Sequence, residues 1–285
     1  KYGQNNIFYL SAHKNHFNNA LQDYNIKIND LKTEISYFGF RLWHFLSSKR
    51  KLLSKNSIEK FDLIIDLQSK LRNTLILKQI PNRHFYSSTL NFKFCSTHKD
   101  YISTKYDNNN IILNLEKLLN DKIVFRKYDT NLIDSKYFTE AKRLLPDSNY
   151  IGFSITQGNA YRKKSWPIEK FLSVANKILK QNKIPVFFIE RNNIDLINKI
   201  KNEIQNVLIP ELDSNLSGPP LVTALSKRLE KAISIDNGIM HMIGLANIPM
   251  TVLFGPTNSK KFSPKIKNIN ICLLYTSPSP RDLST

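Results

Sequence analysis

The sequence predicts an α/β protein, and three observations support this class. From residue 150 onward, short apolar segments alternate with segments of helical periodicity. The connections between them are short, which is typical of parallel strands joined by right-handed crossovers. The chain of 285 residues is also long enough for two domains that each bury a core of their own.

The second half has the regular pattern of a complete Rossmann-like domain, expected over residues 148–272. Pro167 is suited to the first turn of a helix, and apolar residues then recur at helical spacing over 168–179. Two more helices are expected at Ile194–Ile204 and Pro220–Arg228. The strands expected between the helices are short and apolar: Tyr150–Ile155, Ile184–Glu190, Val207–Ile209, Lys231–Ile235 and Met250–Phe254.

The first half is less regular. Ile7–Leu10 and Phe61–Leu67 are predicted strands, the second with the continuous apolar run of a buried parallel strand. Residues 31–55 form an aromatic-rich helical stretch, for which packing over the sheet is favoured over contact with a membrane. A loop-rich region is expected over residues 81–110.

The boundary between the halves is expected after a helix around Thr139–Leu145, where Pro146-Asp147-Ser148 has the composition of a linker. Residues 1–147 would then form the N-terminal domain. From Leu273 the sequence becomes rich in Ser and Pro and loses its apolar periodicity. Residues 273–285 are therefore predicted to be a non-native tail that takes no part in the fold.

Composition excludes several classes of protein. The formal net charge is +19, but the lysines are scattered and no nucleic-acid-binding motif accompanies them. Nucleic-acid binding is therefore the least favoured of three explanations of the charge, behind codon usage in an AT-rich genome and attraction to an acidic acceptor or an anionic membrane surface. No apolar run reaches the roughly 18 residues of a membrane span, and the N-terminus lacks a signal-peptide pattern. Cys95 and Cys272 lie far apart, which favours structural thiols in a reducing cytoplasm.

The most informative segment runs from Ile235 to His241 and predicts a strand end, a polar turn and the start of a short helix. Asp236 falls at the carboxyl end of its strand, where open α/β sheets bind ligands. Gly238 permits close approach of the backbone, and the helix start offers free N–H groups to an anion. A capped helix with one core histidine is the alternative. The F-G-P-T turn at Phe254–Thr257, after the next strand, favours the ligand site.

Three blocks, in the same order along the chain, resemble those of glycosyltransferase family 9, the bacterial lipopolysaccharide heptosyltransferases. Phe61–Gln68 resembles the family's Tyr-Asp-x-x-Ile-Asp-x-Gln strand, and Lys164–Pro167 resembles its Lys-x-Trp-Pro helix start. Residues 236–257 resemble its Asp-(Ser/Thr)-Gly-x-x-His signature with the following Pro-x-x-x-Phe/Tyr-Gly-Pro-Thr. Two departures are Asn237, where the family has Ser or Thr, and Ser69, where it has Gly.

The resemblance implies a GT-B fold, in which two Rossmann-like domains face a cleft, and an inverting transferase that moves heptose from ADP-heptose or a similar nucleotide sugar to the lipopolysaccharide inner core. No Asp-x-Asp pair stands at a strand end, so we expect neither a metal nor a cofactor. Cationic side chains and backbone N–H groups would then hold the donor diphosphate. Lys164 is implied to contact it, with a solvated lysine as the alternative. The expected donor-binding residues are Thr156, Gln157, Lys164, Asp236, Asn237, Gly238, Ile239 and His241.

On the acceptor side, the resemblance implies Gln68 and Arg72 as binding residues. Family members open with a strand and a Gly-Asp turn that carries the catalytic base, whereas this sequence starts at the second strand. We therefore expect the first βα unit and the base to lie upstream of Lys1, with Asp66 as the nearest substitute.

The implied partners are a nucleotide sugar and a phosphorylated glycolipid, with no nucleic acid. The implied location is cytoplasmic, with peripheral contact at the inner face of the anionic bacterial inner membrane. Two alternatives stay open: a donor-binding but catalytically defective fragment, and another GT-B activity such as that of a sugar-nucleotide epimerase.

Overall fold

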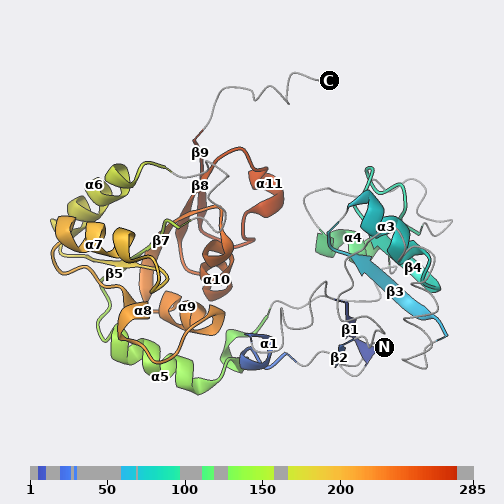
Figure 1. Cartoon of the computed structure of the whole chain (residues 1–285), viewed down its shortest axis with the longest axis horizontal. Coiled ribbons are helices and arrows are strands. Elements are labelled where there is room, and N and C mark those ends of the chain that lie inside the picture. The colour runs from blue at the N-terminus through green and yellow to red at the C-terminus, as the bar shows by residue number, and fades with distance from the viewer. Residues whose placement is uncertain are drawn as a thin grey trace. The chain divides into compact units, whose positions relative to one another are not determined.

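The computed structural model describes residues 6–10, 20–26, 29–30, 59–68, 70–96, 111–118, 128–156 and 166–274 (Figure 1). The chain divides into two compact units. The first comprises Lys1–Gln22 and Ile26–Lys127, and the second comprises Asp23–Asn25 and Tyr128–Thr285. Both units contain parallel strands joined by helices, which confirms the predicted α/β class.

A five-stranded parallel sheet forms the centre of the second unit, with the strand order β6-β5-β7-β8-β9. Beyond β6, Leu208 makes a single parallel bridge to Val186, so residues 207–209 extend the sheet by one bridge where a strand was expected. With that bridge, the order is the one usual for doubly wound, nucleotide-binding sheets. The strands are β5 Tyr150–Ser154, β6 Ile184–Phe187, β7 Leu229–Ile235, β8 Met250–Phe254 and β9 Ile269–Leu273.

Helices cover this sheet, and α6 and α7 share one apolar core with it. Within that core the Phe153 and Phe187 rings stack at 4.7 Å, and Trp166 meets Phe171 edge-on at 5.1 Å. A different group of helices forms around α9, which contacts both α5 and α10 (Figure 1). The helices of this unit are α5 Ser135–Leu144, α6 Ile168–Leu179, α7 Ile194–Glu203, α8 Pro210–Asp213, α9 Pro219–Ser226, α10 Gly238–Ala246 and α11 Ser259–Phe262, with a 3-10 turn, η3, at Thr130–Leu132.

The described part of the first unit is smaller. Its main strands, β3 and β4, pair in parallel, and α3 connects them. Ile76, Leu77, Ile80 and Phe85 form a small apolar core under α3. The elements of the N-terminal part are β1 Phe8–Tyr9, α1 Ala20–Asp23, β2 Asn29–Asp30, β3 Phe61–Asp66, α3 Leu71–Lys78, β4 Asn82–Ser87 and α4 Ile111–Leu118.

Strand β4 and the start of the expected tail differ from the sequence-based expectations. Strand β4 falls in the region expected to be loops, because its sequence N-R-H-F-Y-S has no aliphatic run and depends on pairing with β3. The expected tail starts too early, because Leu273 pairs with Phe254 in β9 and the Leu274 N–H donates to the Phe254 carbonyl at 2.8 Å. The aromatic-rich stretch at 31–55 lies outside the described residues.

Helix α5, which sequence reasoning assigned to the N-terminal domain, belongs to the second unit. It contacts α9, and the chain that follows it is held by the Arg228 guanidinium. That side chain donates to the carbonyls of Leu145 at 3.0 Å, Pro146 at 2.8 Å and Asp147 at 2.9 Å. The expected linker is therefore bound along the second unit.

A short upstream segment also packs onto the second unit. Tyr24, which follows α1, is only 7% exposed, and its hydroxyl lies 2.7 Å from the Thr223 hydroxyl of α9. Beside it, the Tyr137 hydroxyl of α5 donates to the Asp23 carboxylate at 2.7 Å. Residues 23–25 are thus a structural part of a unit whose remainder begins at residue 128.

Candidate functional site

The candidate donor site lies at the carboxyl ends of β5 and β7. These two strands are neighbours in the sheet, but the chain continues from β5 to β6 on one side and from β7 to β8 on the other. The strand order therefore reverses between them, and such a switch point opens a crevice in which α/β proteins bind ligands. The turn at residues 236–237 joins the carboxyl end of β7 to α10 at this position.

Asn237 holds this turn together. Its Oδ1 accepts a hydrogen bond from the Met240 N–H at 2.9 Å, which caps α10. Its Nδ2 donates to the Ser154 hydroxyl at 2.8 Å and to the Thr156 carbonyl at 2.9 Å, both at the end of β5. One carboxamide thus connects two strands and a helix. Asn237 was expected to bind the donor directly, but these bonds favour a role in shaping the site.

The first turn of α10 presents the groups that an anion would bind. Met240 is capped by Asn237, whereas the N–H groups of Gly238 and Ile239 precede any intrahelical partner. The positive end of the helix dipole adds to their attraction for a negative charge. A Cβ atom built on Gly238 would meet no protein atom within 4 Å, so the space beside this backbone is open.

Asp236 is oriented by a residue that the sequence reasoning did not single out. The Thr257 hydroxyl, from the turn after β8, donates to Asp236 Oδ2 at 2.5 Å. β7 and β8 are parallel neighbours, so their carboxyl ends bring the two turns together. The F-G-P-T motif at 254–257 was the available signal, because a hydroxyl in that motif falls opposite the end of β7. Asp236 remains only partly buried.

His241 lies one turn into α10 and is exposed at the surface. Neighbouring protein atoms nevertheless desolvate the imidazole in part, and this lowers its pKa from the ordinary value, against a smaller opposing effect of the Asp236 charge. The neutral ring is therefore the main form at pH 7, and it can donate a hydrogen bond through one nitrogen. Of the other expected donor-binding residues, Thr156 lies beside Asn237 just after β5, whereas Gln157 and Lys164 fall outside the described residues.

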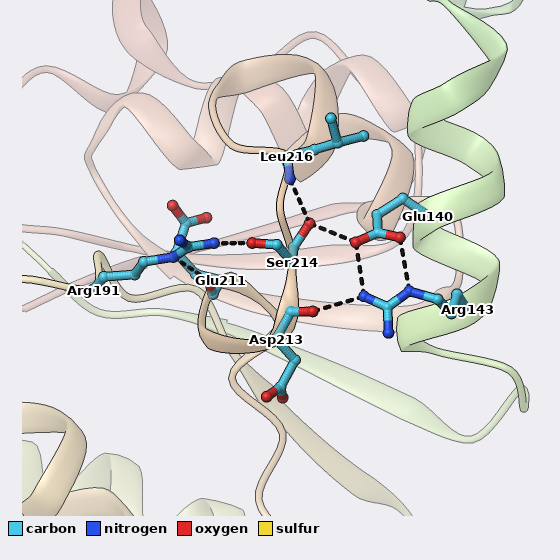
Figure 2. Close-up of polar contacts among 7 residues, drawn as sticks. All are labelled: Glu140, Arg143, Arg191, Glu211, Asp213, Ser214 and Leu216. Atoms are coloured by element: carbon cyan, nitrogen blue, oxygen red, sulfur yellow. Dashed lines mark hydrogen bonds and ion pairs between the residues drawn. The ribbon is translucent and has the colours of Figure 1, made fainter.

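The loop that follows α8 carries a second polar network that sequence reasoning missed (Figure 2). Arg191 donates to the backbone carbonyls of Glu211 and Ser214. The Ser214 hydroxyl donates to Glu140 at 2.7 Å, and Arg143 donates to the same carboxylate at 2.8 Å. The Arg143 hydrogen bonds, followed by that of Ser214, lower the pKa of Glu140 to about 2. This network fixes the loop beside the carboxyl end of β6 and joins it to α5.

Of the three site residues expected in the first unit, Asp66 is buried, whereas Gln68 and Arg72 are exposed. Asp66 is 2% exposed, and its carboxylate accepts hydrogen bonds from the Thr74 hydroxyl at 2.6 Å, the Ser87 hydroxyl at 2.9 Å and the Gln68 N–H at 3.1 Å. These bonds occupy the carboxylate in joining β3, β4 and α3, so a structural role replaces the suggested substitute base. Gln68 and Arg72 are exposed at the carboxyl end of β3.

Within the described ranges, no three His, Cys, Asp or Glu side chains gather in a way that would hold a metal ion. Across those same residues, no helix is both long and apolar enough to cross a bilayer.

The fold defines an α/β protein of the GT-B kind, and comparison with known proteins identifies the family. The sequence pattern of glycosyltransferase family 9 (heptosyltransferase) matches residues 49–284. The chain belongs to this family, and its role is therefore the transfer of a glycosyl group. A search among curated proteins finds no match.

Solved structures share the fold at low sequence identity. A glycosyltransferase family 9 protein from Veillonella parvula DSM 2008 is similar with a TM-score of 0.61 and 18% identity, over 92% of this chain and 76% of that chain. E. coli heptosyltransferase WaaC with ADP-2-deoxy-2-fluoro heptose has a TM-score of 0.54 and 13% identity, over 88% and 78%. The same enzyme with ADP has a TM-score of 0.53 and 12% identity, over 80% and 71%.

Proposed function

We propose that this protein transfers heptose from ADP-heptose to the inner core of lipopolysaccharide, without a metal ion and with inversion at the anomeric carbon. The observation that supports the donor half is the turn at Asn237, which aligns the carboxyl ends of β5 and β7 with the open first turn of α10. This arrangement suits a diphosphate. The heptosyltransferase structures with ADP and with a fluoro analogue of ADP-heptose suggest which diphosphate it is.

The proposed chemistry requires that negative charge be stabilised on the departing diphosphate. The acceptor hydroxyl attacks the anomeric carbon from the face opposite the leaving group, and the bond to the β-phosphate oxygen breaks. Backbone N–H groups of Gly238 and Ile239, with the helix dipole behind them, would receive that charge. Lys164 and a neutral His241 would add a cation and a hydrogen-bond donor. Asp236, held by Thr257, would accept hydrogen bonds from the sugar hydroxyls.

The acceptor half of the proposal places a phosphorylated glycolipid near Gln68 and Arg72, at the carboxyl end of β3. An excess of cationic groups, +19 overall, would favour such an acceptor and peripheral contact with an anionic membrane surface. Since Asp66 is already hydrogen-bonded within the fold, the base that takes the proton from the acceptor hydroxyl is proposed to be another carboxylate.

Calorimetry with ADP, UDP and GDP in the presence of EDTA tests the donor assignment. ADP should bind without a divalent metal, and Asp236→Ala should weaken the binding of ADP-heptose by about 1–3 kcal/mol, the scale of lost charge-assisted hydrogen bonds. Asp195→Ala, at an exposed position in the first turn of α7, is the matched control and should change nothing.

Mass spectrometry of a deacylated lipid A carrying Kdo, incubated with the protein and ADP-heptose, tests the transfer itself. A mass increase of one heptose supports the acceptor assignment. Equal affinity for all three nucleotides would contradict the ADP-linked donor, and binding that depends on Mg²⁺ would contradict metal independence.

A further inference from the structure

One buried polar atom of the first unit is left without a hydrogen-bond partner. Among the described residues, Asn73 Oδ1 is the single buried side-chain nitrogen or oxygen in this condition. The Asn73 side chain is 4% exposed and lies in the first turn of α3. A buried acceptor without a donor destabilises a fold, so such an atom calls for an explanation.

The rest of the same carboxamide is well bonded. Asn73 Nδ2 donates to Gln68 Oε1 at 2.6 Å. Reversing both carboxamides would preserve this bond, but it would leave Asn73 Nδ2 unpaired in place of the oxygen. Either orientation binds Gln68 through one end of Asn73 and leaves the other end unpaired. Unpaired buried N–H groups are rarer than unpaired carbonyl oxygens, so the orientation with Asn73 Oδ1 unpaired, and with Nε2 as the free end of the Gln68 carboxamide, is favoured.

The neighbourhood of this pair shows what the bond achieves. The Asp66 carboxylate accepts a hydrogen bond from the Gln68 N–H at 3.1 Å, which holds the Gln68 backbone in place. Its side chain is exposed and would otherwise sample several rotamers. The bond from Asn73 occupies Gln68 Oε1 and leaves Nε2 as the end of this exposed side chain that is available to a ligand, at the carboxyl end of β3. Arg72, in the first turn of α3, is also exposed.

We propose that Asn73 is a positioning residue, which fixes the Gln68 carboxamide so that its Nε2 donates to an oxygen of the glycosyl acceptor. The acceptor's identity as a sugar rests on the function proposed above. The fold retains one unpaired buried atom in Asn73, and the same side chain fixes the orientation of an exposed hydrogen-bond donor in Gln68. A pre-oriented donor binds a sugar oxygen without first losing rotamer freedom, which favours affinity.

The proposal predicts a signature that a structural asparagine would not show. Replacing Asn73 with a side chain of similar volume and no polar atom removes the unpaired atom along with the bond to Gln68. Asn73→Leu should therefore unfold at the same temperature as the parent or at a higher one. At the same time it should bind the acceptor about tenfold more weakly, the effect expected when one oriented hydrogen bond is lost.

Three measurements on the full 285-residue chain test this. The first is the melting temperature. The second is ¹⁵N relaxation of the Gln68 side-chain amide, assigned by comparison with Gln68→Ala. The third is calorimetry with a deacylated lipid A carrying Kdo and, separately, with ADP. In Asn73→Leu the Gln68 amide order parameter should fall to the flexible range, below about 0.6. Affinity for ADP should stay at the parent value.

Two further variants guard against a simple packing effect. Asn73→Ala removes the same groups without filling the space, so it should show the same Gln68 mobility and the same loss of acceptor affinity even where it melts lower than Asn73→Leu. Asn82→Ala is the matched control, since Asn82 Nδ2 donates to the Ile80 carbonyl at 2.7 Å at the opposite end of β4. It should melt lower and bind the acceptor normally.

A lower melting temperature of Asn73→Leu with an unchanged Gln68 amide would overturn the proposal. So would unchanged acceptor affinity in a variant whose Gln68 has become mobile. If the parent chain binds ADP but not the deacylated acceptor, the acceptor assignment fails in the parent before any variant is compared. In that case the relaxation data still decide whether Asn73 holds Gln68.

Discussion

Replacing Asn237 should reduce both the stability of the second unit and its affinity for ADP. In Asn237→Ala the cap on α10 is lost, a change that costs about 1 kcal/mol. The buried Ser154 hydroxyl also loses the carboxamide that it contacts, and an unpaired buried hydroxyl costs about 1–3 kcal/mol. The Thr156 carbonyl is partly exposed, so water can replace its lost partner. The sum is about 2–4 kcal/mol.

Urea denaturation measures this loss, and calorimetry with ADP measures its effect on the site. A frayed first turn of α10 no longer presents fixed N–H groups, so ADP affinity should fall at least about tenfold, or 1.4 kcal/mol. Asn237→Ser retains a cap for Met240, but its shorter side chain cannot also reach the Thr156 carbonyl. We expect about half of the stability loss in this variant.

Asn258 offers a matched control, because its side chain also caps a helix by accepting from the Lys261 N–H, but it makes no connection between strands. Asn258→Ala should cost about 1 kcal/mol or less and leave ADP affinity unchanged. If Asn237→Ala is as stable as the parent within about 0.5 kcal/mol, the role assigned to this carboxamide is refuted.

Two further predictions concern α10. A bound diphosphate should raise the lowered pKa of His241, so ADP binding should be accompanied by uptake of a proton. The affinity for ADP should therefore rise as the pH falls through the His241 pKa of the complex. It should level off below the His241 pKa of the free protein. His241→Gln should remove this contribution, leaving only the titration of ADP itself, and an unchanged profile would show that the imidazole does not contact the phosphates. Gly244→Ala should lower the melting temperature, because the new Cβ would lie 2.6 Å from Pro264 Cβ. In Gly238→Ala the new Cβ meets no protein atom within 4 Å, so this variant should keep its stability and bind ADP more weakly. Equal behaviour of the two glycine variants would contradict both assignments.

Sequence reasoning predicted the second unit well because its pattern is strong. Strand β8 and helix α6 have the expected bounds, since long apolar periodicity leaves few alternatives. Strand β4 was missed because N-R-H-F-Y-S carries no such pattern and is stabilised by pairing with a neighbour. Strand β9 was missed for a similar reason, as an edge strand with mostly exposed side chains.

The candidate site could be predicted in its residue types but not in its connections. Asp236 and Gly238 follow from a strand end and a helix start, which are local features. The contacts of Thr257 with Asp236 and of Asn237 with Ser154 join residues that are 21 and 83 positions apart. Which turns meet depends on the strand order, and the sequence does not state that order.

The docking of residues 23–25 has a consequence for synthesis on the ribosome. Tyr24 leaves the exit tunnel long before Thr223, its partner 199 positions later, so its ring has no site to occupy while most of the chain is made. The second unit can therefore close around Tyr24 only after α9 has left the tunnel, and until then the Tyr24 ring stays without its native contacts. A gene fragment that starts at residue 128 would lack residues 23–25 and so the contact of Tyr24 with α9. Adding residues 20–26 as a separate peptide should restore this contact.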